Sequence, residues 1–134
     1  MSMDIYAEEL LSHYEHPHNK GEIATAETKM HEHNNTCGDD ITVYLKIDGD
    51  KVDDVKFDGD GCSISIGTTS MLTDYIKGKS ISDIEKMDFT TIKNLINIDP
   101  GPARLKCATI SLKAVKEAIF NYEKKEVDDS TKDL

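Results

Sequence analysis

The sequence of 134 residues lacks any apolar run approaching the ~18 residues of a membrane-spanning helix. Its N-terminus, MSMDIYAEELL, is acidic and lacks the basic and apolar regions of a secretory signal peptide. Basic residues are outnumbered, 16 against 26 acidic ones, which gives a net charge of −10. Nucleic-acid binding needs clustered Lys and Arg. We therefore expect a cytoplasmic protein without a membrane or nucleic-acid partner.

Cysteine is scarce, and the chain contains only Cys37, Cys62 and Cys107. No two of them form a CxxC pair, and long intervals separate all three. An odd number of cysteines in a cytoplasmic chain argues against a disulfide framework. The cysteines are therefore candidates for free thiols, redox chemistry or metal binding.

The composition is that of a globular chain, with 37% hydrophobic and 31% charged residues. Its length suits one domain around one hydrophobic core. We expect this single domain to span residues 1–134, with the charged residues 123–134 as a frayed tail.

Two segments alternate apolar and polar residues, 41–48 and 52–58, and a turn at Asp48–Asp50 joins them as a β-hairpin. Residues 24–32 form a weaker strand candidate, so the sequence predicts a three-stranded antiparallel sheet. Apolar residues at helical spacing predict helices at 5–16, 71–76, 89–96 and 103–122, and a capping box that begins at Ser82 predicts a short helix at 82–85. The fold class is therefore α+β, with helices packed on the sheet and a long C-terminal helix.

Each cysteine lies at the end of a predicted element. Cys37 is in the turn-forming stretch NNTCGDD, Cys62 precedes a helix, and Cys107 is near the start of the last helix. A helix N-terminus favours the thiolate, which is the form that binds metals and attacks electrophiles. We expect Gly59 and Gly61 to give a bulky ion or cluster room beside Cys62.

Three thiolates and the carboxylate of Asp39 would make a four-ligand tetrahedral set that suits zinc or an iron–sulfur cluster. An oxygen ligand is the harder donor among soft sulfurs, which favours a site that can open. Spacing alone leaves open that the three cysteines are unrelated and fill gaps in the core.

Three segments resemble the IscU/SufU/NifU-type iron–sulfur cluster assembly scaffolds: NNTCGDDI at 34–41, GDGCSISIGTTSML at 59–72 and PARLKCATISLKAV at 102–115. The opening stretch YAEELLSHYEHPHNKG at 6–21 resembles the same family, so the similarity covers nearly the whole chain. It implies a three-stranded antiparallel sheet packed with helices.

The resemblance also implies a function. Cys37, Asp39, Cys62 and Cys107 would bind the metal or nascent cluster, a transient [2Fe–2S] unit destined for apo iron–sulfur proteins. A cysteine desulfurase would supply persulfide sulfur to Cys37 or Cys107. We therefore expect a scaffold or sulfur acceptor rather than a stand-alone enzyme.

The alternative is a SufU-like sulfurtransferase that holds Zn²⁺. Lys106 favours it, because IscU-like scaffolds have a histidine before the third cysteine. The short interval between Cys62 and Cys107 favours the scaffold, because the SufU-like branch usually has an insertion there. Two other possibilities are a structural zinc site, which Asp39 argues against, and a cysteine hydrolase with His31 or His33 as base.

Overall fold

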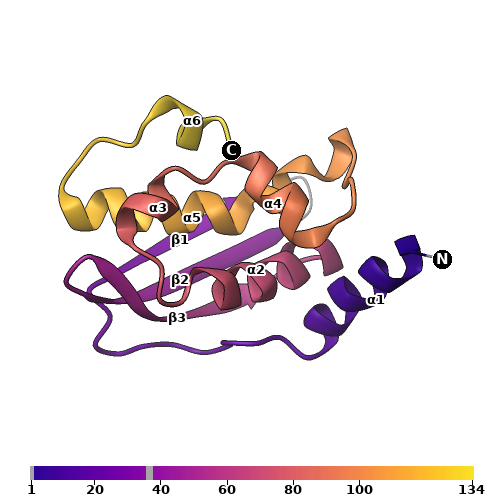
Figure 1. Cartoon of the computed structure of the whole chain (residues 1–134), viewed down its shortest axis with the longest axis horizontal. Coiled ribbons are helices and arrows are strands. Elements are labelled where there is room, and N and C mark those ends of the chain that lie inside the picture. Colours follow the sequence, from indigo (N-terminus) through magenta and orange to yellow (C-terminus); the bar gives the residue numbers. More distant parts are fainter. Residues whose placement is uncertain (1, 36–37) are drawn as a thin grey trace.

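A computed structural model describes residues 2–35 and 38–134 of the chain. It is an α+β fold in which one helix precedes three strands and the remaining helices follow them (Figure 1). The elements are α1 (Ser2–Glu15), β1 (Thr28–Asn34), β2 (Asp39–Asp48), β3 (Lys51–Asp60), α2 (Ser63–Ile76), α3 (Ile81–Glu85), α4 (Phe89–Ile96), the 3₁₀ helix η1 (Pro102–Arg104), α5 (Leu105–Glu123) and α6 (Asp129–Lys132).

The three strands form one antiparallel sheet in the order β1-β2-β3. The predicted alternation holds on β2, where Ile41, Val43 and Leu45 are all fully buried. Val55 and Phe57 of β3 are fully buried on the same side. The predicted sheet and fold class are therefore confirmed.

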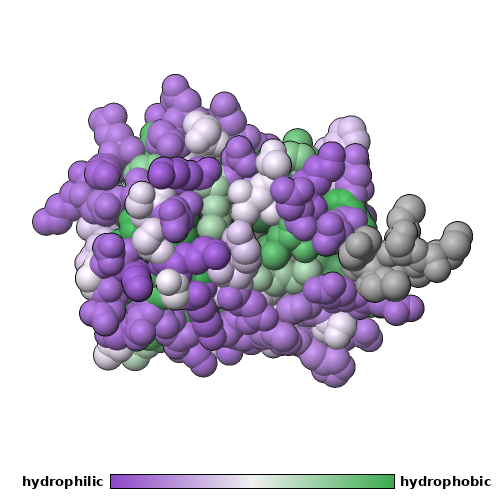
Figure 2. Space-filling model, viewed as in Figure 1, coloured by the Kyte–Doolittle hydropathy of each residue, from purple (hydrophilic) through white to green (hydrophobic). Residues whose placement is uncertain are grey.

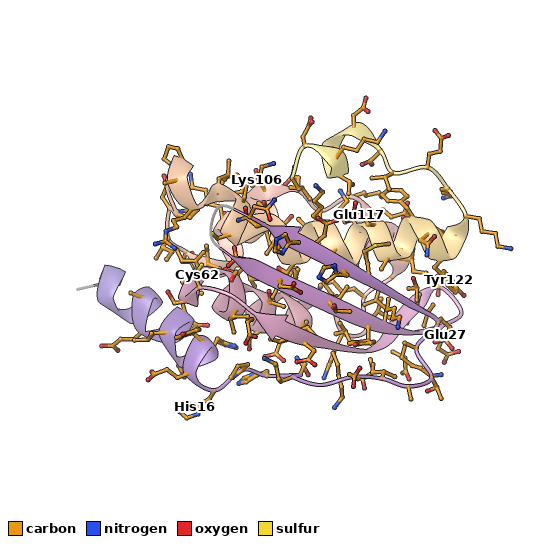
Figure 3. All side chains as sticks on the ribbon, turned by 180° about the vertical axis from the view of Figure 1, so that it is seen from behind. His16, Glu27, Cys62, Lys106, Glu117 and Tyr122 are labelled. Carbon is orange, nitrogen blue, oxygen red and sulfur yellow. The ribbon has the colours of Figure 1, made fainter. Side chains whose placement is uncertain are left out.

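Helices cover one face of the sheet, with α5 and α2 packed directly on the strands (Figure 1). Seen from behind, the strands lie in front of these helices (Figure 3). Helix α1 packs beside α2 so closely that a Cβ on Gly67 would lie 2.7 Å from the carbonyl oxygen of Leu10. A glycine is needed at this crossing for steric reasons.

Some element boundaries differ from the prediction. Strand β1 covers 28–34 rather than 24–32, and α2 begins at Ser63. The first turns of α2 are rich in small polar side chains, which give no apolar stripe to detect although they are buried between helices. Ser80 caps α3 by accepting a hydrogen bond from the N–H of Asp83 at 3.1 Å, so the N-cap lies two residues before the predicted Ser82 and the helix begins at Ile81.

The C-terminal segment is not the frayed tail that we expected. Asp128 caps α6 by accepting a hydrogen bond from the N–H of Thr131 at 2.9 Å. Thr131 is fully buried and Leu134 is 8% exposed, because α6 packs against α5. The Lys106 ammonium donates a hydrogen bond to the carbonyl oxygen of Leu134 at 2.7 Å, which holds the segment in place.

The face of the molecule shown in Figure 2 is largely hydrophilic, and hydrophobic residues appear mainly in the recesses between polar ones. Over the described part of the chain, no helix combines the length and apolar character needed to cross a bilayer.

Candidate metal and sulfur site

Three predicted site residues meet where β2, α2 and α5 converge. One carboxylate oxygen of Asp39 and the sulfur atoms of Cys62 and Cys107 all lie within 4.8 Å of one another. Cys37, the fourth predicted ligand, lies outside the described residues. The fold thus brings together three side chains that are far apart in the sequence.

Each of the three residues occupies the end of an element. Asp39 is the first residue of β2 and pairs in register with Asn34, the last residue of β1. Cys62 is the N-cap of α2, and its sulfur accepts a long hydrogen bond from the N–H of Ser65 at 3.5 Å. Cys107 lies in the first turn of α5. The positive end of the α2 dipole therefore faces the Cys62 sulfur.

The Asp39 carboxylate is fully buried and surrounded by donors. Its Oδ1 accepts hydrogen bonds from the N–H of Cys62 at 3.0 Å and from the Ser65 hydroxyl at 2.9 Å. Its Oδ2 accepts one from the Asn34 amide at 3.2 Å. Burial alone would raise the pKa of Asp39, but these bonds and one from the Cys107 thiol together lower it. The carboxylate is therefore ionised at neutral pH.

The Cys107 sulfur is fully buried beside this charge. It accepts a long contact from the Asn34 amide at 3.8 Å, and its thiol donates to Asp39. A metal ion held by both groups would take the place of this proton.

The glycines around Cys62 have a different role from the one we expected. A Cβ on Gly61 would lie 2.2 Å from the Ser65 hydroxyl and 2.8 Å from Oδ1 of Asp39. A Cβ on Gly59 would lie 1.9 Å from the carbonyl oxygen of Asp40. The space is thus filled by the protein's own atoms rather than left for an ion, and Gly61 lets Ser65 reach Asp39.

Two histidines considered as catalytic bases lie on the other side of the sheet. His31 and His33 are exposed on β1, and both approach Asp40, at 2.6 Å and 3.6 Å respectively. Consecutive strand residues face opposite sides, so these histidines do not share the side of Asp39. The geometry does not support a hydrolase in which they act on the described cysteines.

Lys106 also points away from the site, toward the backbone of the residues that follow α6. Its ammonium donates to the carbonyl oxygens of Leu134 and Asp133, at 2.7 Å and 3.3 Å.

Two side chains that hydrogen-bond to Asp39 were not identified from the sequence. They are those of Ser65 and Asn34. Neither carries a local signal, because each reaches the carboxylate from another element.

The residues present fit a thiophilic metal or cluster. Two sulfur donors and an ionised oxygen donor converge, and the charge of a bound cation would offset the buried carboxylate. Figure 3 shows Cys62 at one end of the sheet, with Lys106 nearby on α5.

Comparisons with known proteins agree with this arrangement. The chain is 38% identical to the zinc-dependent sulfurtransferase SufU of Bacillus subtilis, over 89% of this chain and 92% of that protein. It is 30% identical to the iron–sulfur cluster assembly scaffold protein IscU 1 of Archaeoglobus fulgidus, over 90% of this chain and 78% of that protein.

The fold is shared with the N-terminal part of a nitrogen-fixing NifU-like protein from Brucella abortus, with a TM-score of 0.79 over 92% of this chain and 97% of that one. At 19% identity, this likeness concerns the fold alone. The family model described as the NifU-like N terminal domain matches residues 5–129. The chain therefore belongs to the NifU-like N-terminal domain family.

Proposed function

We propose that this protein is a cytoplasmic iron–sulfur cluster assembly scaffold. It accepts sulfur from a cysteine desulfurase, assembles a transient [2Fe–2S] cluster on Cys37, Asp39, Cys62 and Cys107, and transfers that cluster to apo iron–sulfur proteins. The observation that carries the proposal is the ionised, buried carboxylate of Asp39 within 4.8 Å of two cysteine sulfurs.

This donor set suits a cargo that has to leave again. The sulfurs of Cys62 and Cys107 are strong ligands for iron, whereas a carboxylate is a weaker partner for a soft site. Asp39 also keeps hydrogen-bond donors on both of its oxygens, so it has partners to return to when the cargo departs.

Sulfur would arrive by thiol–persulfide exchange. The thiolate of Cys37 or Cys107 attacks the outer sulfur of the desulfurase persulfide. A new S–S bond forms on the acceptor while the S–S bond of the donor breaks, and the donor cysteine departs as a thiolate. Cys107 first has to lose the proton that it donates to Asp39.

A second candidate is zinc-dependent sulfur transfer, in which Zn²⁺ holds the cysteines until the desulfurase engages. The orientation of Lys106 favours it, since this residue occupies the position of the scaffold-type histidine and its ammonium is bound to backbone carbonyls instead. The 38% identity to the zinc-dependent sulfurtransferase SufU is further support.

The test is to measure iron, zinc and acid-labile sulfide before and after anaerobic incubation with iron, cysteine and a desulfurase. Matching iron and sulfide with a visible chromophore supports the scaffold. Retained zinc without a chromophore, together with a persulfide on Cys37 or Cys107, supports zinc-dependent transfer. Absence of both cluster and persulfide would overturn both candidates.

Variants make this test specific. Cys107→Ser should lose the cluster, because it removes a sulfur ligand without adding bulk. His16→Ala is the matched control, because it removes an exposed side chain outside the site and should assemble as the wild type does.

A further inference from the structure

A second group of ligand-forming side chains lies where the end of α1 and the loop after it meet the C-terminal half of α2. His13 of α1 and His18 of the loop lie close to Asp74 of α2. Asp74 is about 18 Å beyond Cys62 along the helix axis, at ~1.5 Å per residue. This group is therefore separate from the cysteine site.

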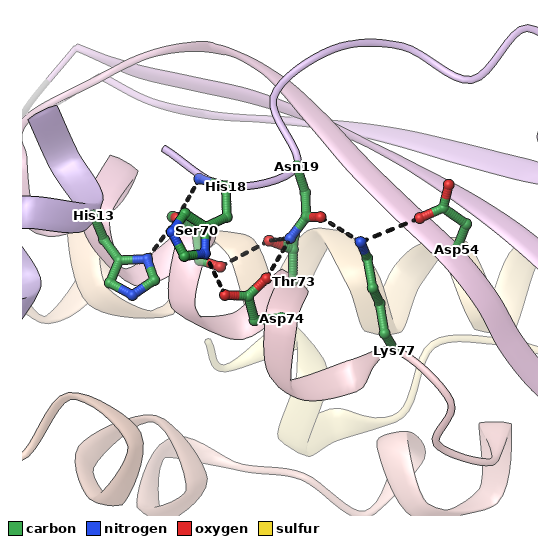
Figure 4. Close-up of polar contacts among 8 residues, drawn as sticks. All are labelled: His13, His18, Asn19, Asp54, Ser70, Thr73, Asp74 and Lys77. Atoms are coloured by element: carbon green, nitrogen blue, oxygen red, sulfur yellow. Dashed lines mark hydrogen bonds and ion pairs between the residues drawn. The ribbon is translucent and has the colours of Figure 1, made fainter. Parts of the chain in front are cut away.

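The histidines are bound to α2 by short contacts (Figure 4). Nδ1 of His13 lies 2.7 Å from the Ser70 hydroxyl, and Nδ1 of His18 lies 2.5 Å from Oδ2 of Asp74. The two imidazole rings are adjacent, with centroids 4.4 Å apart. Ser70 thus orients the His13 ring as outer-shell hydrogen-bond partners orient metal-binding histidines.

The loop that carries His18 is itself anchored to α2. The His18 backbone N–H donates to the Ser70 hydroxyl at 2.7 Å. The Asn19 amide donates to the Thr73 hydroxyl at 2.9 Å and to Oδ1 of Asp74 at 2.8 Å (Figure 4). The position of the histidines is therefore fixed by contacts other than those between the ligand atoms.

We propose that His13, His18 and Asp74 form a second metal site, which binds a divalent transition-metal ion such as Zn²⁺. One candidate ligand atom from each residue lies within 4.8 Å of the other two. Tetrahedral zinc with bonds of about 2.0–2.1 Å needs these atoms about 3.3 Å apart. The side chains of His18 and Asp74 are 55% and 44% exposed, so they can move by the small distance required.

Binding would place the metal between His18 and Asp74 in place of their direct contact, and water would fill the remaining coordination position. The ion would join α1, its following loop and α2 into one unit. Imidazole and carboxylate donors without sulfur suit zinc but not an iron–sulfur cluster. This site does not rest on the proposed function, because it uses none of the cysteines.

The test is a titration of the reduced, metal-free full-length chain with Co²⁺ as a spectroscopic probe for zinc. We expect two equivalents to bind, one with a thiolate-to-cobalt charge-transfer band and one with ligand-field bands only. His18→Ala and Asp74→Asn should each weaken the thiolate-free site by about 10-fold or more and leave the charge-transfer band unchanged. His16→Ala should retain both sites.

Two results would overturn the proposal: binding of a single equivalent with thiolate character, or a thiolate-free equivalent whose affinity stays within twofold in His18→Ala. His18 is largely exposed, so its replacement should preserve the fold, and thermal melting of the apo variants checks this. Loss of the charge-transfer band alone would count against the cysteine site and leave this one standing.

Discussion

Asp39 and Glu117 are two carboxyl groups placed between the sheet and α5, and they differ in protonation at neutral pH. Asp39 is ionised, whereas Glu117 is largely protonated. Asp39 is fully buried, and its donors lower its pKa. Glu117 lies against Glu32 of β1, and burial followed by this second carboxylate raises its pKa to about 8. No hydrogen-bond partner within the described structure reaches its buried Oε1.

The difference shows that burial alone does not decide whether a carboxylate is charged. Asp39 is the more buried group and yet stays ionised, because N–H and O–H donors converge on it. Glu117 meets another acid, so a proton is the simplest way to remove the repulsion. The two groups are about 15 Å apart along α5, judged from Cys107 at ~1.5 Å per residue, so the proposed metal site and the Glu117–Glu32 pair lie in separate places.

The largest expected effect comes from removing Asp39. Asp39→Ala leaves the N–H of Cys62 and the Ser65 hydroxyl without their acceptor, so we expect a loss of about 2–4 kcal/mol in the free energy of unfolding. Chemical denaturation of the apo protein measures it. Asp39→Asn is the matched control, because its carbonyl oxygen can still accept, and it should lose less. Equal losses in both variants would mean that charge, not hydrogen bonding, holds this region.

The same substitution tests whether Asp39 makes the cargo labile. If the carboxylate is the weak ligand, a cluster assembled on Asp39→Ala should decay more slowly than one on the wild type. The decay of the visible chromophore after removal of the desulfurase measures this lifetime. An unchanged lifetime would count against Asp39 as the element that opens the site.

A smaller effect is expected from Glu117→Gln, and it depends on pH. The folded-state pKa of about 8 is above the ordinary 4.5, so the folded protein binds more protons between these values. The free energy of unfolding should therefore fall as pH rises from about 5 to 8. Solvent screening of this partly exposed pair limits the change to about 1–2 kcal/mol. Glu117→Gln should abolish this slope, whereas Glu126→Gln, at an exposed position, should retain it.

The smallest effect should come from Lys113→Met. The Lys113 ammonium lies 3.9 Å from Glu32 and lowers the pKa of Glu117. Without it the pair should hold its proton to higher pH, and stability at pH 8 should fall by about 0.5 kcal/mol. Denaturation across the same pH range measures both. A shift of the pH-dependent limb to lower pH would contradict this assignment.

The sheet could be predicted from the sequence because alternation is a local signal. Residues 41–48 and 52–58 show it, and both became strands. Strand β1 was misplaced because its outward positions carry His31 and His33 while its inward ones include Glu32, so polarity hardly alternates. The tail was misjudged because its helix depends on packing against α5 rather than on its own composition.

The candidate site was only partly predictable, because its residues are brought together by contacts between distant segments rather than by a local sequence pattern. Cysteine spacing carried no motif, so the grouping of Asp39, Cys62 and Cys107 depended on family resemblance. His13 and His18 are close in the sequence, at the end of α1 and in the loop after it. Their partner Asp74, more than 50 residues away, could be assigned only once the fold placed α2 beside them.

The proposed ligands that the structure describes, Asp39, Cys62 and Cys107, lie at the ends of β2, α2 and α5, and Asp39 accepts a hydrogen bond from the backbone of Cys62. An unfolded chain cannot present such a set, so any ion bound there reports that three distant segments have assembled. Occupancy should therefore protect the junction of these elements from proteolysis and slow its amide exchange. Release of the bound ion or cluster would then loosen the junction of β2, α2 and α5. A recipient protein could distinguish the loaded from the empty form by this difference.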